Sequence, residues 1–174
     1  MIGIMGVVGL ERRERPPLSP ILLKQLLAVE PSLDHGFEYR PCEVTLVDGS
    51  IVSDVYVQSS IPYYELWGID PEDDEGKSSV LVDDIAEIRS SPYRLAPDLA
   101  TKLYRSPESG MVWRAFRVFL TNGETLLCTT GNAVDFLAWP KDVGPADVVD
   151  VESGGHWTDA VVENSDYSWA LYGE

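Results

Sequence analysis

The sequence predicts a mainly β fold of the α+β class, in which two duplicated antiparallel β units accompany an N-terminal helix and a short linker helix. Two repeats carry this prediction: "EVTLVDGSIVSDVYV" at 43–57 returns as "RVFLTNGETLLCTTG" at 117–131, and "DDIAEIRSS" at 83–91 returns as "ADVVDVESG" at 146–154. A unit of three or four short strands cannot cover its own apolar face. We therefore expect the copies to share a core within one compact domain, either as small half-open barrels or as a pseudo-two-fold sandwich.

The N-terminal segment, residues 1–39, contains the clearest helix signal of the chain at residues 20–30. Ser19 can cap this helix, Pro20 suits its first position and Pro31 ends it. Four leucines repeat at helical spacing, which predicts a stripe that docks on the main body: Leu22, Leu23, Leu26 and Leu27.

The first β unit is expected at residues 40–91 and the second at 114–154. In each copy an alternating strand leads into a two-residue turn, Asp48-Gly49 in the first and Asn122-Gly123 in the second, 74 residues later. These residue types tolerate the positive φ that a tight hairpin turn needs. The closing segments are offset by only 63 residues, because the acidic loop "GIDPEDDEGKSS" lengthens the first copy.

The linker at residues 92–113 predicts a short helix over 95–105, where leucines recur on one side and Pro97 falls in the first turn. The last segment, residues 155–174, is expected to form a further β hairpin. Its apolar residues are available for burial: Trp157, Val161, Tyr167, Trp169 and Leu171.

Charge limits the classes of partner. The formal net charge is −16, and residues 118–174 hold ten acids against a single base, Lys141. Such a field repels nucleic acids and anionic membranes, so we expect the protein to bind neither of them. We expect instead a protein partner that is basic in character. Residues 89–117 are locally basic. A homodimer in which the acidic and basic regions of two copies pair is therefore a second hypothesis.

The cysteines and the opening of the chain bear on localisation. Cys42 and Cys128 fit no metal-ligand or redox spacing and fall in predicted strands, which favours buried thiols in a reducing compartment. The opening "MIGIMGVVGL" has no preceding basic region and is too short to span a bilayer. We therefore expect a cytoplasmic location.

Candidate catalytic residues are few, because the sequence contains neither a GxSxG elbow nor an SxxK motif. His156 is a candidate general base if Asp159 or Asp150 lies beside it, although a solvated strand-end histidine is the favoured interpretation. Asp135, in "TTGNAVDFLAWP", is an acid among apolar neighbours. Such a residue is either structural or functional, and we favour a structural role.

The sequence predicts no cofactor and no dedicated metal site, since phosphate-binding loops and zinc-ligand spacings are absent. Asp70, Glu72 and Asp74 alternate as weak candidate ligands for a hard cation such as Ca²⁺. Gly76 stands one place late for an EF-hand, and Leu81 occupies the position of the bidentate glutamate. A solvated acidic loop is the favoured interpretation.

Two stretches resemble other proteins. "RLAPDLATKLYRSPESGM" at 94–111, followed by "TGNAVDFLAWP", resembles segments of uncharacterised bacterial proteins of unknown function. The hairpin "VTLVDGSIVSDVYV" is similar to the first strands of Sm-like and SH3-like small barrels. The acid excess departs from the RNA-binding Sm-like proteins, so that function is not implied.

Three hypotheses about function follow. The first is an acidic, non-catalytic interaction module that binds a protein partner, as immunity proteins and inhibitors do. The second is a hydrolase that uses Asp and Glu residues with His156. The third is a small-ligand-binding β-barrel with tryptophans in an apolar groove: Trp113, Trp139, Trp157 or Trp169.

Overall fold

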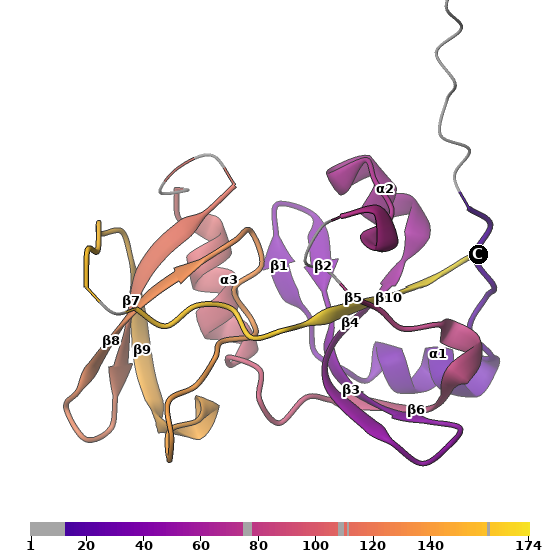
Figure 1. Cartoon of the computed structure of the whole chain (residues 1–174), viewed down its shortest axis with the longest axis horizontal. Helices are drawn as coiled ribbons and strands as arrows, with labels where there is room; N and C mark the ends of the chain where they lie inside the picture. Colours follow the sequence, from indigo (N-terminus) through magenta and orange to yellow (C-terminus); the bar gives the residue numbers. More distant parts are fainter. Residues whose placement is uncertain (1–12, 75–77, 108–109, 111, 160) are drawn as a thin grey trace, which may run out of the picture.

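The two β units lie side by side along the longest axis of the molecule (Figure 1). The computed structural model describes residues 13–74, 78–107, 110, 112–159 and 161–174, so residues 1–12 of the N-terminal segment and 75–77 of the acidic loop lie outside the described part. Within it are three α-helices: α1 (Pro20–Leu27), α2 (Ser60–Trp67) and α3 (Pro97–Arg105). The ten strands are β1 (Ser32–Asp34), β2 (Phe37–Tyr39), β3 (Pro41–Leu46), β4 (Ile51–Ser59), β5 (Ser78–Ser79), β6 (Ile85–Ser90), β7 (Arg114–Leu120), β8 (Thr125–Thr130), β9 (Val148–Ser153) and β10 (Ser168–Tyr172).

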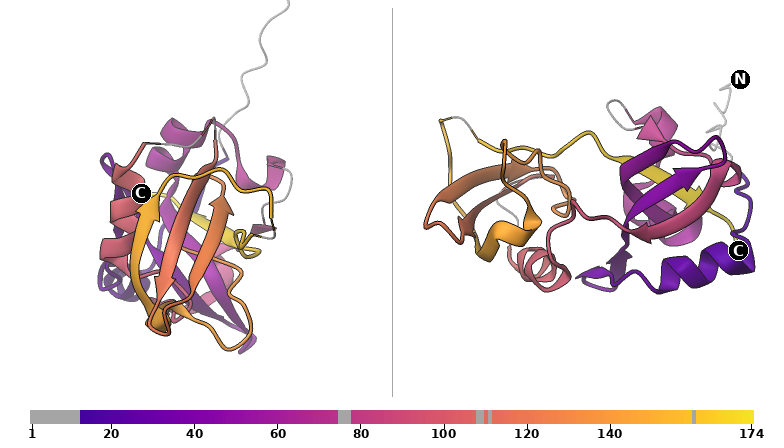
Figure 2. Two further views of the ribbon diagram at one scale, coloured as in Figure 1. Left: turned by 90° about the vertical axis from the view of Figure 1, so that its left-hand side faces the viewer. Right: turned by 90° about the horizontal axis from the view of Figure 1, so that it is seen from below.

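The strands form three sheets and confirm the mainly β, α+β fold. The first unit contributes to a five-stranded sheet in the order β5-β10-β4-β3-β6, the second unit is the three-stranded sheet β8-β7-β9, and β1 pairs with β2. None of the sheets built from the described residues closes into a barrel. The right-hand view of Figure 2 shows the units next to one another rather than stacked as a sandwich.

The strands of the two units also pair in equivalent register. The central strand β3 lies between β4 and β6 with Val44 opposite Ile88, and β7 lies between β8 and β9 with Val118 opposite Val151. Each closing strand follows a short 3-10 helix, η2 (Val82–Asp84) or η3 (Pro145–Asp147), and each shows a register shift at its start. The offsets of 74 and 63 residues read from the sequence therefore align equivalent elements.

The two hairpin turns are equivalent in backbone conformation, because Gly49 has φ 87° and Gly123 has φ 86°. A Cβ at either position would meet no atom within 4 Å, so the cost of a side chain there is conformational. We expect Gly49→Ala and Gly123→Ala each to lower the free energy of unfolding by about 1–2 kcal/mol, in chemical denaturation. Unequal losses, with one variant unaffected, would contradict the equivalence of the turns.

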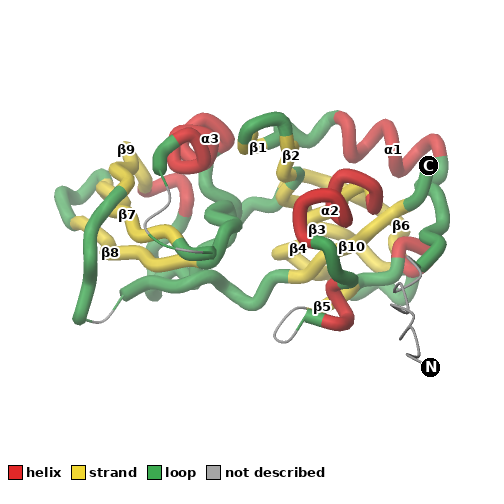
Figure 3. The backbone as a smooth tube through the Cα atoms, turned by 90° about the horizontal axis from the view of Figure 1, so that it is seen from above, coloured by secondary structure: helices red, strands yellow, loops and turns green. Residues whose placement is uncertain are grey.

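Helix α1 begins where the sequence predicts and ends three residues early, at Leu27. The Ser19 hydroxyl accepts a hydrogen bond from the Leu22 amide at 3.3 Å, and Leu22 and Leu26 are buried. The helix packs along β6 of the first unit (Figure 3). It covers a core that belongs to this unit alone: Leu18, Leu22, Leu26, Val29, Cys42, Val44, Val55, Val57, Val82, Ile85, Ile88 and Ala170.

Helix α3 lies at Pro97–Arg105, within the predicted linker helix, and packs on both β1 and β9, so it connects the two units. Helix α2 was not expected from the sequence. It follows β4 directly and ends at Gly68, which adopts φ 78°. Its apolar residues point in several directions, with Tyr63 buried and Leu66 exposed, so it lacks the one-sided stripe by which sequence reveals a helix.

The C-terminal segment does not form the hairpin predicted for 155–174. It crosses from the second unit back to the first and ends in one strand, β10, which pairs in parallel with β4 so that Trp169 lies opposite Tyr56. Along the way its described residues form isolated β bridges to the second unit, Cys128 with Val162 and Leu137 with Asn164, and the Asn164 side chain adds hydrogen bonds to the same unit. Parallel pairing needs no local turn, so the partner of this strand leaves no signal beside it in the sequence.

An aromatic core is shared by both units. Tyr39 stacks on Tyr104 of α3 with ring centroids 4.6 Å apart, and Trp169 stacks on Tyr56 at 4.8 Å. Phe116 of the second unit belongs to the same buried cluster. The predicted common interior therefore exists, but it lies between neighbouring units and not between stacked sheets.

Candidate functional site

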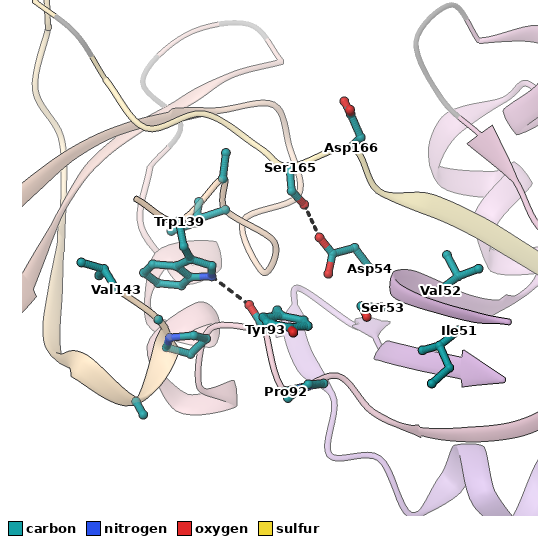
Figure 4. Close-up of a pocket in the computed structure, with 15 residues that line it drawn as sticks. Ile51, Val52, Ser53, Asp54, Pro92, Tyr93, Trp139, Val143, Ser165 and Asp166 are labelled. Carbon is teal, nitrogen blue, oxygen red and sulfur yellow. Dashed lines mark hydrogen bonds between the residues drawn. The ribbon is translucent and has the colours of Figure 1, made fainter. Parts of the chain in front are cut away.

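A cleft of about 780 Å³ opens between the two units (Figure 4). This volume falls in the range of about 300–1,000 Å³ that is usual for ligand sites. One wall is the start of β4, Ile51–Asp54. The opposite wall holds Tyr93 and Trp139, and Ser165 and Asp166 of the crossing segment complete the lining.

The apolar wall is fixed by a hydrogen bond, since Trp139 Nε1 donates to the Tyr93 carbonyl oxygen at 3.0 Å. Figure 4 shows the indole and the Tyr93 ring close together on the side of the cleft opposite Val52. A side chain that enters the cleft therefore meets an indole ring that is already positioned.

Asp54 supplies the charge of the opposite wall. The Ser165 hydroxyl donates to Asp54 Oδ2 at 2.5 Å, whereas Oδ1 is buried and has no hydrogen-bond partner among the described residues. Burial, and then the charge of Glu43, raises the pKa of Asp54 above its usual value. An acceptor oxygen without a donor is costly in a folded protein, so this carboxylate is suited to receive a donor from outside the chain.

The position of Asp54 comes from a difference between the copies. In the second unit Phe116 pairs with Cys128 and Val118 with Leu126, two residues apart on both strands. In the first unit Cys42 pairs with Val55 and Val44 with Val52, so β4 carries one extra residue and the ladder has a bulge there. Bulges redirect side chains and are frequent beside functional sites.

The cleft offers negative charge without a compensating base. Among the described residues of its lining, Asp54 and Asp166 are the acids, and there is neither a lysine nor an arginine. Arg89, on β6 of the same sheet, donates to Glu43 at 2.7 Å, and Glu43 also accepts from Ser53. The cleft can therefore bind a cationic group whose stem packs on the aromatic wall.

Asp135 lies elsewhere, at the buried junction of the two units, with an exposed fraction of 0%. Its carboxylate accepts hydrogen bonds from Tyr104 at 2.6 Å, from Tyr56 at 3.0 Å and from Ser32. Arg94 Nη2 lies 3.9 Å from Asp135 Oδ1, and desolvation raises the pKa of the acid against the effect of this cation. Enclosed in this way, Asp135 has the surroundings of a structural residue.

The structure does not assemble the general base considered for His156. The ring is exposed, and no hydrogen bond or ion pair joins it to another residue in the described ranges. Asp150 is engaged by Lys102 at 2.8 Å, and Asp159 is exposed.

Two of the three weak candidate metal ligands, Asp70 and Glu72, are held by arginines, so this part of the acidic loop is not simply solvated as expected. Arg15 binds both Asp70 and Glu72, and Arg13 lies 3.1 Å from Glu72. Asp74 lies apart from them, at an aromatic pocket. No group of three or more His, Cys, Asp and Glu residues in the described part of the chain is arranged to hold a metal ion.

The basic segment 89–117 is largely engaged within the chain. Its ion pairs are Arg89 with Glu43, Arg94 with Asp135, Lys102 with Asp150, Arg114 with Asp34, and Arg117 with Glu152. Arg105 is exposed without an ion pair to any residue that the structure describes. Five of the six cations that motivated the homodimer hypothesis therefore form ion pairs within the chain.

Comparison with known proteins gives no lead: no family model, no curated protein and no solved structure matches this chain. Among the described residues, no helix has the length and apolar character required to cross a membrane.

Of the residues that line the cleft, the sequence analysis singled out Trp139 but missed Asp54. The signal that could have revealed Asp54 is the break of alternation at Ser53-Asp54 in an otherwise apolar strand.

Proposed function

We propose that this protein is a non-catalytic interaction module that binds a basic segment of a protein partner in the cleft between its two units. The observation that carries the proposal is the Asp54 carboxylate, which lines a cleft with no lysine or arginine among its described lining residues, and whose buried Oδ1 has no donor within the described part of the chain. A lysine or arginine side chain of the partner supplies that donor, while its stem packs on Trp139 and Tyr93.

The charge of the whole chain supports the same partner. A net charge of −16 steers a basic protein toward this surface and raises the rate of association at low salt. Immunity-like and inhibitor-like proteins recognise basic partners on this principle.

Two features support a binding role over a catalytic one. Burial raises the pKa of both Cys42 and Cys128 to about 12, so neither thiol forms a thiolate at neutral pH. Within the described part of the chain, no carboxylate is hydrogen-bonded to His156, as a general base would need. The proposal places the protein in the cytoplasm, since both cysteines are free and buried.

The test is the affinity for a short labelled peptide of alternating lysine and alanine, measured by fluorescence anisotropy at several salt concentrations. We expect Asp54→Asn to weaken binding by about tenfold, because it removes the charge opposite the bound ammonium. The matched control is Asp159→Asn, which removes an equal charge at an exposed site outside the cleft and should change the affinity less than about twofold. Equal effects of both variants would mean that the peptide responds only to net charge, and would refute a cleft site.

The loss of binding in Asp54→Asn should not come from unfolding. Because the folded-state pKa of Asp54 is raised, ionisation costs stability once the pH exceeds the unfolded value of about 3.9. We expect Asp54→Asn to be as stable as the native chain or up to about 1 kcal/mol more stable at pH 7, with the difference vanishing below about pH 4, in urea unfolding at both pH values. A variant clearly less stable at pH 7 would show that the ionised carboxylate serves the fold.

A further inference from the structure

The cleft continues along β4 beyond Asp54. Its lining includes Ile51 and Val52, at the start of this strand. A strand rises by about 3.3 Å per residue, so Ile51 lies about 10 Å from Asp54 along β4. Figure 4 shows Ile51 and Val52 on one side of Asp54 and Trp139 on the other. The cleft therefore extends past the position of a basic side chain bound at Asp54.

Ile51 is an apolar side chain that the fold leaves uncovered. It is 55% exposed, whereas Val52 beside it packs against the core of the first unit. The equivalent residue of the second unit is polar: Ile51 pairs with Thr45, and Thr125 pairs with Phe119 at the same place in the hairpin. The strand pairing thus accepts a threonine at this position, so the fold itself does not require an aliphatic residue there.

Tyr93 adds a second uncovered apolar surface to the cleft. It is 51% exposed, and Pro92, also in the lining, is exposed as well. Apolar residues exposed singly are ordinary on a protein surface, but several in one concavity are typical of an interaction site. The acids Asp54 and Asp166 belong to the same lining as Ile51, and the chain has a net charge of −16. Charge complementarity therefore indicates an occupant that is both basic and apolar.

We infer that the basic segment bound in the cleft carries a large aliphatic side chain, such as leucine, within two residues of its lysine or arginine, and that Ile51 contacts this side chain. The inference rests on the proposed function and adds a second anchor to it. An extended segment also advances by about 3.3 Å per residue, so a side chain one or two positions from the basic residue reaches toward Ile51 while the basic group stays near Asp54. Contact between the two aliphatic side chains removes apolar surface from water, which favours this partner over a purely basic one.

The test compares two labelled peptides of equal charge by fluorescence anisotropy: a repeat of Lys-Ala-Ala, and the same peptide with one central alanine replaced by leucine. We expect leucine to strengthen binding to the native protein by about fivefold. Ile51→Ser should remove most of this gain and change the affinity for the leucine-free peptide by less than about twofold. Equal affinities of the native protein for the two peptides would overturn the inference.

Val47→Ser is the matched control, because Val47 is 68% exposed at the turn of the same hairpin and lies outside the cleft lining. Both variants change exposed side chains, so both should fold like the native chain. We expect Val47→Ser to keep the full gain from leucine. Equal losses of the gain in Ile51→Ser and Val47→Ser would mean that leucine adheres to exposed apolar surface in general, and the assignment to Ile51 would fail.

Asp54→Asn, measured with the same two peptides, separates this inference from the proposed function. We expect it to weaken both peptides by about tenfold, so that the gain from leucine persists. If it weakens both peptides but leucine adds no affinity, the second anchor is refuted and the cleft stands as a site for basic side chains alone. If it leaves both affinities unchanged, the proposed function fails, and the second anchor fails with it.

Discussion

Asp135→Ala is expected to lower the free energy of unfolding by about 3–5 kcal/mol, because it removes the acceptor at the centre of a buried hydrogen-bond network. Arg94, with a side-chain exposure of 5%, lies beside this carboxylate and donates its hydrogen bonds to the Ser32 hydroxyl and to the backbone carbonyl oxygens of Leu95 and Glu30. The substitution also strips the hydroxyls of Tyr56 and Tyr104 of their common acceptor. A domain of ordinary stability has about 5–15 kcal/mol in total, so the loss should be plain in denaturant unfolding.

Asp135→Asn separates the contribution that the shape of this side chain makes to stability from the contribution of its charge. The amide keeps an acceptor oxygen for the tyrosines, and it removes a carboxylate whose pKa is raised by desolvation, so that its ionised form costs stability above about pH 4. We therefore expect the asparagine variant to lose less than half as much as the alanine variant at pH 7. A native-like midpoint for Asp135→Ala would contradict the role assigned to this junction.

Trp169→Ala is expected to cost about 3–5 kcal/mol, the range for removing a large aromatic side chain from a core. Trp169 is 3% exposed and lies against Tyr56 and Tyr63, each with a centroid distance of 4.8 Å. It stands on β10, the strand by which the chain returns to the first unit. Its loss therefore opens a cavity where the shared core and the C-terminal strand meet.

The control for this variant is Leu66→Ala, at a residue of α2 that is 48% exposed, where we expect a change within about 0.5 kcal/mol. Unfolding should be followed both by far-ultraviolet circular dichroism and by fluorescence. Similar midpoints for Trp169→Ala and Leu66→Ala would mean that β10 contributes little to the fold.

The duplicated hairpins could be predicted because their turn residues and apolar alternation are local features of the sequence and occur in both copies. A turn such as Asp48-Gly49 fixes the chain direction, and the apolar alternation beside it fixes the buried face. The pairing of Val44 with Ile88 and of Val118 with Val151 follows from the same alternation.

What could not be predicted depends on contacts between distant segments. The parallel pairing of β10 with β4 leaves no turn to be recognised. Asp135 stands out in the sequence as an acid among apolar residues, but its partners come from positions as far as Ser32, 103 residues away. The cleft required both a bulge in β4 and the relative placement of two units, neither of which is a property of one stretch of sequence.

The measurement that tests the proposed cleft most directly is a ¹⁵N-resolved NMR titration of the intact protein with the lysine–alanine peptide. We predict the largest shift changes at the amides of Ser53 and Asp54 and at the indole N–H of Trp139, with saturation at the same peptide concentration. Changes spread over exposed acids such as Asp150 and Asp159, with the cleft signals unmoved, would contradict the account.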